Sequence, residues 1–313
     1  MVVWKGFANL YPTTVRQPMR FFAFLFIWLF FVGQTIEARD YDFKVLVNKG
    51  NNLYRNAPER DWGRIISGTS LVRGGQVKVV ENAYLGLIHV TGNPLEVKTA
   101  GTYSIDYLME RLKEGNKGIG NHYTEFVLNT TEGVAGHEVG SRQHRGTADN
   151  VHLLLPEKGE IFGKELRLEW SVDPVHDNQD VIIKVYDLFN DLLYEQATNG
   201  KRKNISLDQP AFSGQQHLFI EVTLQADHKV KSSMHGIRRL SGEKQQEIQE
   251  KISLINRQAE SPLNRMLLAF FFEYEGLLAD ALSIYLSQME ESSGEEFKEF
   301  YHQFVARNFP GDQ

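Results

Sequence analysis

The hydrophobic pattern changes character several times along the chain. Early on, short β-branched and aliphatic runs alternate with glycine-rich turns, as is typical of antiparallel strands. After them, Ser104 can cap a helix whose apolar residues Ile105, Leu108 and Leu112 share one face. The pattern therefore predicts a β domain with a short terminal helix over residues 39–113.

Residues 114–150 break this regularity. They are rich in Gly, His, Asn and Thr and show no sustained period. We expect a flexible linker here, with a poorly patterned helix as the alternative. Gly115, Gly118 and Gly120 do not indicate a phosphate-binding loop, because no Lys-Ser or Lys-Thr pair follows them.

A second series of strands begins at residue 151. Leu166, Leu168 and Trp170 alternate with charged residues, as expected of a half-buried strand. About seven such short strands over residues 151–240 indicate a β-sandwich of the immunoglobulin or fibronectin type III kind. We expect Trp170 in its core.

The period becomes helical from residue 241 onward. Ser261 followed by Pro262 marks a helix start, since serine caps free backbone amides and proline fits the first helical turn. Further amphipathic helices follow, with dense aromatic residues at positions 270–274 that we expect in the core. Residues 241–313 are therefore predicted to form a helical module, and the fold class is multidomain α+β.

An unbroken apolar run, FFAFLFIWLFFV, fills residues 21–32. It is too short for a membrane-spanning helix, which needs roughly 20 residues, but it suits a secretory signal peptide. Arg20 precedes it, and Ala38 provides a cleavage position. We interpret residues 1–38 as a signal peptide with Met19 as the functional start; retention as a signal anchor is the alternative.

Composition narrows the classes of function. The net charge is −6, which is unlike a nucleic-acid binder, and residues 241–313 hold 13 acidic against 6 basic side chains. Cysteine is absent, which excludes disulfides, thiolate metal sites and cysteine nucleophiles. We expect the mature chain in the periplasm or cell envelope, in contact with the membrane only through its signal segment.

The first β region resembles the FecR-type β domain. The resemblance is carried by the glycine and apolar positions of three stretches, Trp62–Leu71, Gly75–Val77 and Ala83–His89, and it continues through Gly92 and Gly101–Ser104. The order of parts resembles uncharacterised exported proteins of Bacteroidota, which join this domain to a linker, a sandwich and a helical end. Val151–Pro156 and Leu166–Trp170 stand where that pattern places them. The resemblance implies no activity.

The helical end is similar to one tetratricopeptide unit. The matching leucine, small, aromatic, alanine and aromatic positions are Leu268, Ala269, Phe272, Ala281 and Tyr285. Arg265 replaces an expected aromatic residue, and no proline closes the unit. One unit cannot form the usual concave groove, which needs about three repeats. These five residues are therefore candidates for helix packing or for a partner interface.

Candidate chemistry is sparse. His137-Glu138 begins like a zincin motif, but the next histidine is His144, whereas zinc binding from one helix face needs a spacing of about four residues. The acidic stretch 173–180 has oxygen ligands for calcium but lacks the EF-hand spacing, so an interstrand loop is favoured. The carboxylate pairs Glu290-Glu291 and Glu295-Glu296 are most simply solvated helix ends.

These patterns favour a non-enzymatic exported protein, an interaction or scaffold module without a cofactor, whose partners are other envelope proteins. The alternative is an envelope hydrolase, or a receptor for glycan, peptidoglycan or metal. In that case the histidine-rich segment would contribute to a site through His122, His137, His144 and His152. The oligomeric state is left open.

Overall fold

The computed structural model describes residues 40–113, 121–132, 151–177, 179–255, 260–291 and 295–309. The predicted signal peptide lies outside these residues, as do His137 and His144. Asp40–Gln313 form one compact unit. Among the described helices, none has both the length and the apolar character needed to cross a membrane.

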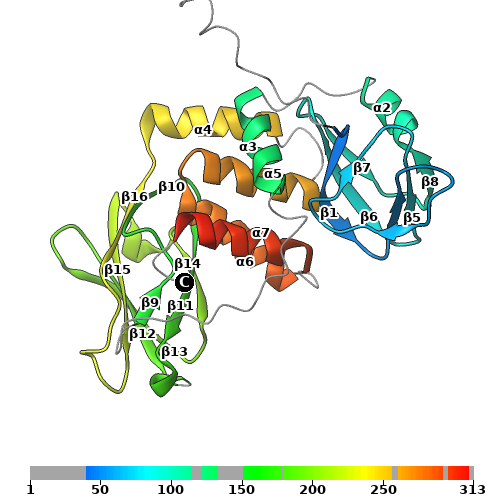
Figure 1. The fold of residues 1–313 in the computed structure, drawn as a ribbon. Helices are drawn as coiled ribbons and strands as arrows, with labels where there is room; N and C mark the ends of the chain where they lie inside the picture. Colours follow the sequence, from blue (N-terminus) through cyan, green and yellow to red (C-terminus); the bar gives the residue numbers. More distant parts are fainter. Residues whose placement is uncertain are drawn as a thin grey trace, which may run out of the picture. The chain divides into compact units, whose positions relative to one another are not determined.

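The first β unit consists of two four-stranded antiparallel sheets (Figure 1), ordered β4-β1-β6-β7 and β3-β2-β5-β8. Its strands are β1 Phe43–Lys49, β2 Leu53–Arg55, β3 Gly63–Arg64, β4 Ser70–Leu71, β5 Gln76–Val79, β6 Tyr84–His89, β7 Pro94–Val97 and β8 Gly101–Ser104. Phe43 and Leu87 of one sheet share a core with Val77 of the other.

Helix α2 (Ile105–Lys113) follows this unit as predicted. The Ser104 hydroxyl accepts a hydrogen bond from the amide of Tyr107 at 3.2 Å, so serine caps the helix. Ile105 and Leu108 are fully buried in the core between the sheets.

The second β unit has a five-stranded sheet, β10-β16-β15-β12-β13, and a three-stranded sheet, β14-β11-β9. Its strands are β9 Val151–Leu153, β10 Lys158–Ile161, β11 Glu165–Val172, β12 Val181–Tyr186, β13 Leu192–Thr198, β14 Arg202–Ser206, β15 His217–Leu224 and β16 His235–Arg239. β10 and β16 are parallel, and the other pairs are antiparallel. Trp170 is 3% exposed in the core that both sheets line, which confirms its predicted burial.

The described helices that follow residue 240 confirm the predicted C-terminal helical region. They are α4 Gly242–Ile255, α5 Pro262–Tyr274, α6 Leu278–Glu291 and α7 Glu295–Asn308. Ser261 caps α5 by accepting a hydrogen bond from the amide of Asn264 at 3.1 Å. Just after the end of α5, Gly276 has a φ of +75°, a conformation that glycine adopts without strain.

A further helix, α3 (Asn121–Glu132), lies in the segment for which the sequence favours a linker. Its buried residues Tyr123, Val127 and Leu128 belong to the same core as α5. The apolar residues of this helix show only a weak helical period in the sequence, because the polar residues Thr130 and Thr131 are buried on it as well. Residues 121–132 therefore form the helix that the sequence leaves as an alternative.

The helical region packs against both β units. Helix α5 contacts β1 and β6, and α6 contacts β10 and β11. At the first contact, the Tyr84 hydroxyl accepts a hydrogen bond from the amide of Leu263 at 3.2 Å. At the second, the Asp280 carboxylate accepts from the amides of Phe162 and Gly163 at 2.9 and 2.7 Å. The protein is thus of mixed α+β class.

Candidate binding surface

The five tetratricopeptide-like positions lie inside the helical region. Ala269, Phe272, Ala281 and Tyr285 are buried in its core, and Leu268 is partly buried against it. The ring of Tyr285 packs on those of Tyr301 and Phe304, with centroids 6.5 and 5.1 Å apart. These positions therefore pack helices together and present little surface to a partner.

The described residues of the acidic stretch, 173–177 and 179–180, lie in the connection between β11 and β12, as favoured, with a short 3₁₀ helix at Pro174–His176. The Asp173 carboxylate accepts a hydrogen bond from the amide of Val175 at 3.1 Å, and Asp177 pairs with Lys201 at 2.9 Å. Within the described part of the chain, no three His, Asp or Glu side chains are grouped to hold a metal ion.

The remaining sequence candidates fall in different places. His152 lies on β9, which is described, while Gly115, Gly118 and Gly120 lie outside the described residues. Glu290 is paired with Arg167 of β11 rather than only solvated. The candidate binding surface is instead the outer face of the five-stranded sheet, which the sequence patterns did not identify.

This surface is the outer face of the five-stranded sheet, the face turned away from the three-stranded sheet. Because side chains alternate along a strand, Leu218 and Ile220 of β15 enter the core while His217, Phe219 and Glu221 take the outer face. The outward residues of neighbouring strands line up in register and form rows across the sheet.

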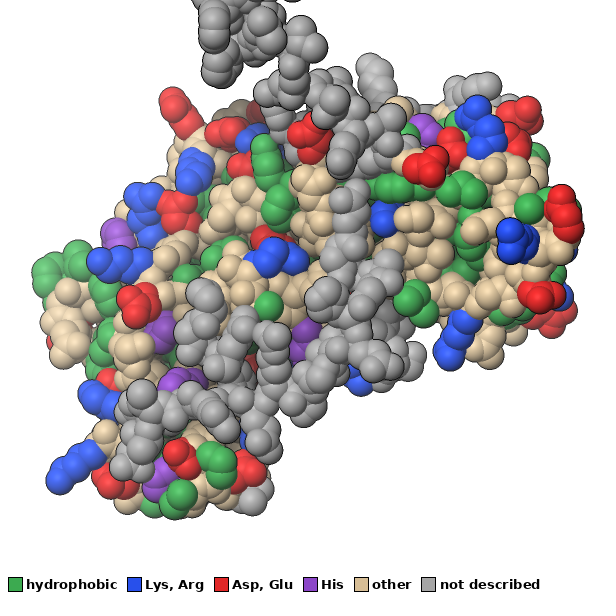
Figure 2. Space-filling view, viewed as in Figure 1, with side chains coloured by type: hydrophobic (Ala, Val, Ile, Leu, Met, Phe, Trp, Pro, Cys, Tyr) green, Lys and Arg blue, Asp and Glu red, His purple; other side chains and the backbone are tan. Residues whose placement is uncertain are grey.

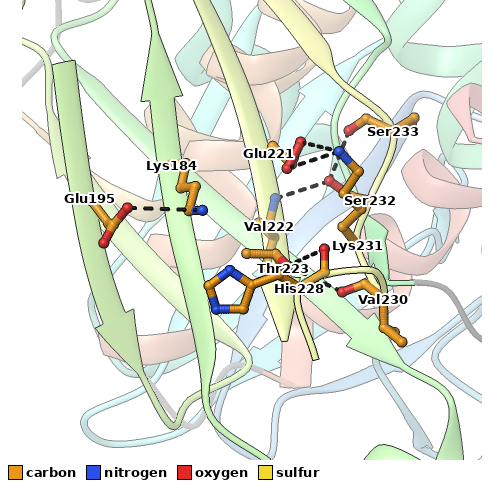
Figure 3. Close-up of polar contacts among 10 residues, drawn as sticks. All are labelled: Lys184, Glu195, Glu221, Val222, Thr223, His228, Val230, Lys231, Ser232 and Ser233. Carbon is orange, nitrogen blue, oxygen red and sulfur yellow. Dashed lines mark hydrogen bonds and ion pairs between the residues drawn. The ribbon is translucent and has the colours of Figure 1, made fainter. Parts of the chain in front are cut away.

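One row is a ladder of alternating charges (Figure 3). Glu195 of β13 lies opposite Lys184 of β12, which lies opposite Glu221 of β15. Lys184 Nζ is 3.9 Å from Glu195 Oε2, and Lys231 Nζ is 3.0 Å from Glu221 Oε2. The Glu221 side chain is only 9% exposed, so its charge requires these lysine neighbours.

The segment that carries Lys231 is fixed to β15 by backbone and hydroxyl contacts (Figure 3). The amide of Ser232 donates to the Val222 carbonyl at 2.8 Å, and the amide of Val222 donates to the Ser232 hydroxyl at 3.0 Å. The Thr223 hydroxyl donates to the carbonyl of Val230 at 3.3 Å. Lys231 is thus held at a defined place beside Glu221.

A second row is mostly apolar. It consists of residues aligned across all five strands, namely Leu192, Tyr186, Phe219, Gly236 and Lys158. A Cβ atom on Gly236 would lie 3.3 Å from the Phe219 ring, so glycine leaves room for that ring on the sheet. Burial, followed by the nearby charge of Glu221, raises the pKa of Tyr186 above its ordinary value.

A shallow groove continues this row toward helix α4. Phe219 lies in it, together with the cationic side chains Lys158, Arg238 and Lys244. Arg238 and Lys244 both bind the Glu160 carboxylate. The hydrogen bond from Lys244, more than that from Arg238, holds the pKa of Glu160 below its usual range. Glu160 therefore offsets part of the positive charge at this end of the face.

The hairpin between β12 and β13 carries an exposed apolar cluster, here called the hydrophobic tip and formed by Leu188, Phe189 and Leu192. Their exposed fractions are 60%, 83% and 51%. On the face drawn in Figure 2, hydrophobic side chains gather at the left edge, where Figure 1 draws this hairpin. Large apolar side chains grouped at one place on a surface mark an interaction site more often than scattered ones do.

The hairpin backbone is held in place by a buried acid. Asp187 is 8% exposed, and its Oδ1 accepts hydrogen bonds from the amides of Phe189 and Asp191 at 2.8 and 2.9 Å. Asn190 adopts φ of +68°, which asparagine tolerates better than most residues. The tip is therefore presented by a turn with defined geometry.

Neither a protein-family model nor a curated protein matches the chain. The one sequence signal for the surface was the stretch from Asp187 to Leu192, where two strands are joined by turn residues that enclose Leu188 and Phe189. Large apolar residues inside a turn are unusual, so this contrast is the signal by which the tip could have been found from sequence, although the patterns considered above did not use it.

Proposed function

We propose that the protein is a non-enzymatic exported envelope protein that binds another envelope protein, and that the hydrophobic tip is its contact site. The proposal keeps the location inferred from the apolar run at residues 21–32. It also keeps the resemblance to exported Bacteroidota proteins that join a FecR-like domain, an Ig-like domain and a tetratricopeptide-like region.

The strand order supports the Ig-like part of this proposal. In immunoglobulin domains, strands B and E lie in one sheet, strands C, F and G lie in the other, and a C′ strand can extend the second sheet. β11 and β14 correspond to B and E, β12, β15 and β16 to C, F and G, and β13 to C′. In Ig-like domains, loops and sheet faces commonly serve as binding surfaces.

The observation that carries the proposal is the exposure of the hydrophobic tip. Burying apolar surface is worth about 25 cal/mol per Å², so a partner that covers Leu188 and Phe189 gains binding energy at little cost in ordering the hairpin. Asp187 already fixes the backbone on which these side chains stand. Aromatic anchors of this kind often dominate an interface.

The test is a double substitution, Leu188→Ser with Phe189→Ser. Both side chains are mostly exposed, so the fold should be retained with little change in stability. The matched control is Val175→Ser, because Val175 is 79% exposed in the loop before β12, far along that strand from the tip. Partners captured by cross-linking in the envelope are identified, purified and titrated against each variant.

We expect affinity for the purified partner to fall by about tenfold or more in the double variant and to stay unchanged in Val175→Ser. Equal affinities for the double variant and the unsubstituted protein would show that the contact lies elsewhere on the molecule.

A further inference from the structure

Strand β13 lies at the edge of the five-stranded sheet, and the direction of its backbone groups follows from the register. The amide of Gln225 donates to the carbonyl of Asp180 at 2.9 Å. This bond flanks the pair Val181–Leu224 and makes it a non-hydrogen-bonded pair between β12 and β15. The backbone groups of Val181 therefore point to the other neighbour, β13.

The alternation continues along β12. Ile182 and Lys184 direct their backbone groups to β15, so their partners on β13, Ala197 and Glu195, are not bonded to them. The amides and carbonyls of Glu195 and Ala197 consequently point out of the sheet. Within the described residues, no backbone hydrogen bond to these four groups is found.

The other edge strands of this unit are protected in ways that β13 is not. Natural edge strands are commonly blunted by short length, proline or lysine. β9 has only three residues, β10 carries Lys158, and β14 carries Lys203. β13 has seven residues, Leu192–Thr198, with neither proline nor lysine, and its register irregularity lies at its start.

The charge ladder indicates what could pair with this edge. Across the sheet, charges alternate from Lys231 to Glu221 to Lys184 to Glu195. The ladder ends at β13 on a carboxylate that is 48% exposed. Opposite charges on directly paired residues stabilise strand pairing, and like charges oppose it. A further strand would continue the alternation with a basic residue.

We propose that a protein partner adds an extended strand to the β13 edge, with a lysine or arginine opposite Glu195. An apolar side chain on the same face of the added strand, about two positions away, then reaches Leu192 of the hydrophobic tip. Backbone hydrogen bonds to Glu195 and Ala197 supply affinity, and the two side-chain contacts supply selectivity. This inference rests on the proposed function and specifies its partner.

The test uses a displayed library of random peptides about seven residues long, the length of an ordinary strand, selected on the protein from Arg39 to Gln313. We expect enrichment of extended sequences with a basic residue next to β-branched or aromatic ones. Selection on Glu195→Lys should reverse the preference at that position to Asp or Glu. Enriched peptides with no charge preference, or the same preference for both proteins, would overturn the proposal.

A second variant isolates the backbone contact. Ala197→Pro removes an amide that points out of the sheet, so it leaves the β12–β13 hydrogen bonds intact, as proline at an edge position does. Ala197→Val is the control, since it keeps the amide and favours strand structure. An enriched peptide should bind Ala197→Pro at least roughly tenfold more weakly and Ala197→Val within about twofold.

The two proposals fail in distinguishable ways. If Ala197→Pro folds and binds the peptide normally, strand addition is wrong, whereas the tip variant still tests the proposed function. Sedimentation of the unsubstituted protein tests for a second copy as occupant. Self-association that Ala197→Pro abolishes would overturn the assignment of a basic partner, because β13 of a second copy has no lysine or arginine to place opposite Glu195.

Discussion

Asp280 connects helix α6 to the turn between β10 and β11. Its carboxylate accepts hydrogen bonds from the amides of Phe162 and Gly163, and a Cβ atom on Gly163 would lie 2.8 Å from Asp280 Oδ1. Burial raises the pKa of Asp280 to about 6, and the two amide bonds oppose that rise. Glycine at position 163 thus allows a close contact whose strength depends on pH.

We predict that Asp280 makes stability fall as pH rises from about 4 to about 6.5. The folded pKa lies above the ordinary value, so the folded state binds more protons than the unfolded state over this interval. The associated stabilisation is fully present below pH 4 and amounts to about 2–3 kcal/mol. Urea unfolding at several pH values should show this slope in the difference between the protein and Asp280→Asn. A difference that is flat or rises with pH would contradict it.

Single residues differ in how far sequence predicts them. The burial of Trp170 and the cap formed by Ser261 follow from local patterns, alternation in one case and a Ser-Pro pair in the other. The role of Asp280 does not follow from a local pattern, because its hydrogen-bond partners Gly163 and Phe162 are 117 and 118 residues away along the chain. A contact of that kind depends on tertiary packing, and no short sequence window contains it.

Helices and strands, like single residues, differ in whether a local sequence pattern or tertiary packing determines them. The strands of the second β unit follow from alternating side chains, but the free edge of β13 depends on strand order across the whole sheet. From sequence, helix α3 is only an alternative, because the polar residues Thr130 and Thr131 are buried on it and hide the usual period. Which face of a sheet stays uncovered is decided by elements distant in sequence.

We predict that Trp170→Ala lowers the free energy of unfolding by about 3–5 kcal/mol, as for other large aromatic side chains removed from a core. Trp170 on β11 lies between the two sheets of the second β unit. Since Trp62 is the other tryptophan after residue 38, emission is best recorded in a Trp62→Phe background. Emission typical of water-exposed indole in the native state would refute the predicted burial.

At the scale of the molecule, the two β units depend differently on the helices. The core of the second unit is built from residues of its own strands and loops, with Ala279 as the contribution of α6. The first unit has a core of its own, but four of its residues belong instead to the helical core, namely Leu46, Val47, Tyr84 and Ile88. The second unit contributes Leu154 and Leu240 to the same helical core. Removing the helices therefore uncovers buried apolar residues on both units, and more of them on the first.

We predict that a fragment of residues 151–240 is monomeric and unfolds cooperatively, whereas a fragment of residues 39–113 self-associates and binds hydrophobic dyes. The reason is the apolar face that α5 covers so closely that a Cβ atom on Gly86 of β6 would lie 3.2 Å from Leu263 Cβ. Exposed patches of this kind promote association. Sedimentation and dye binding of both fragments, with residues 39–313 as the reference, measure the difference. If the fragment of residues 39–113 is monomeric and binds no dye, α5 covers little apolar surface on it. The second β unit would then depend on the helices no less than the first.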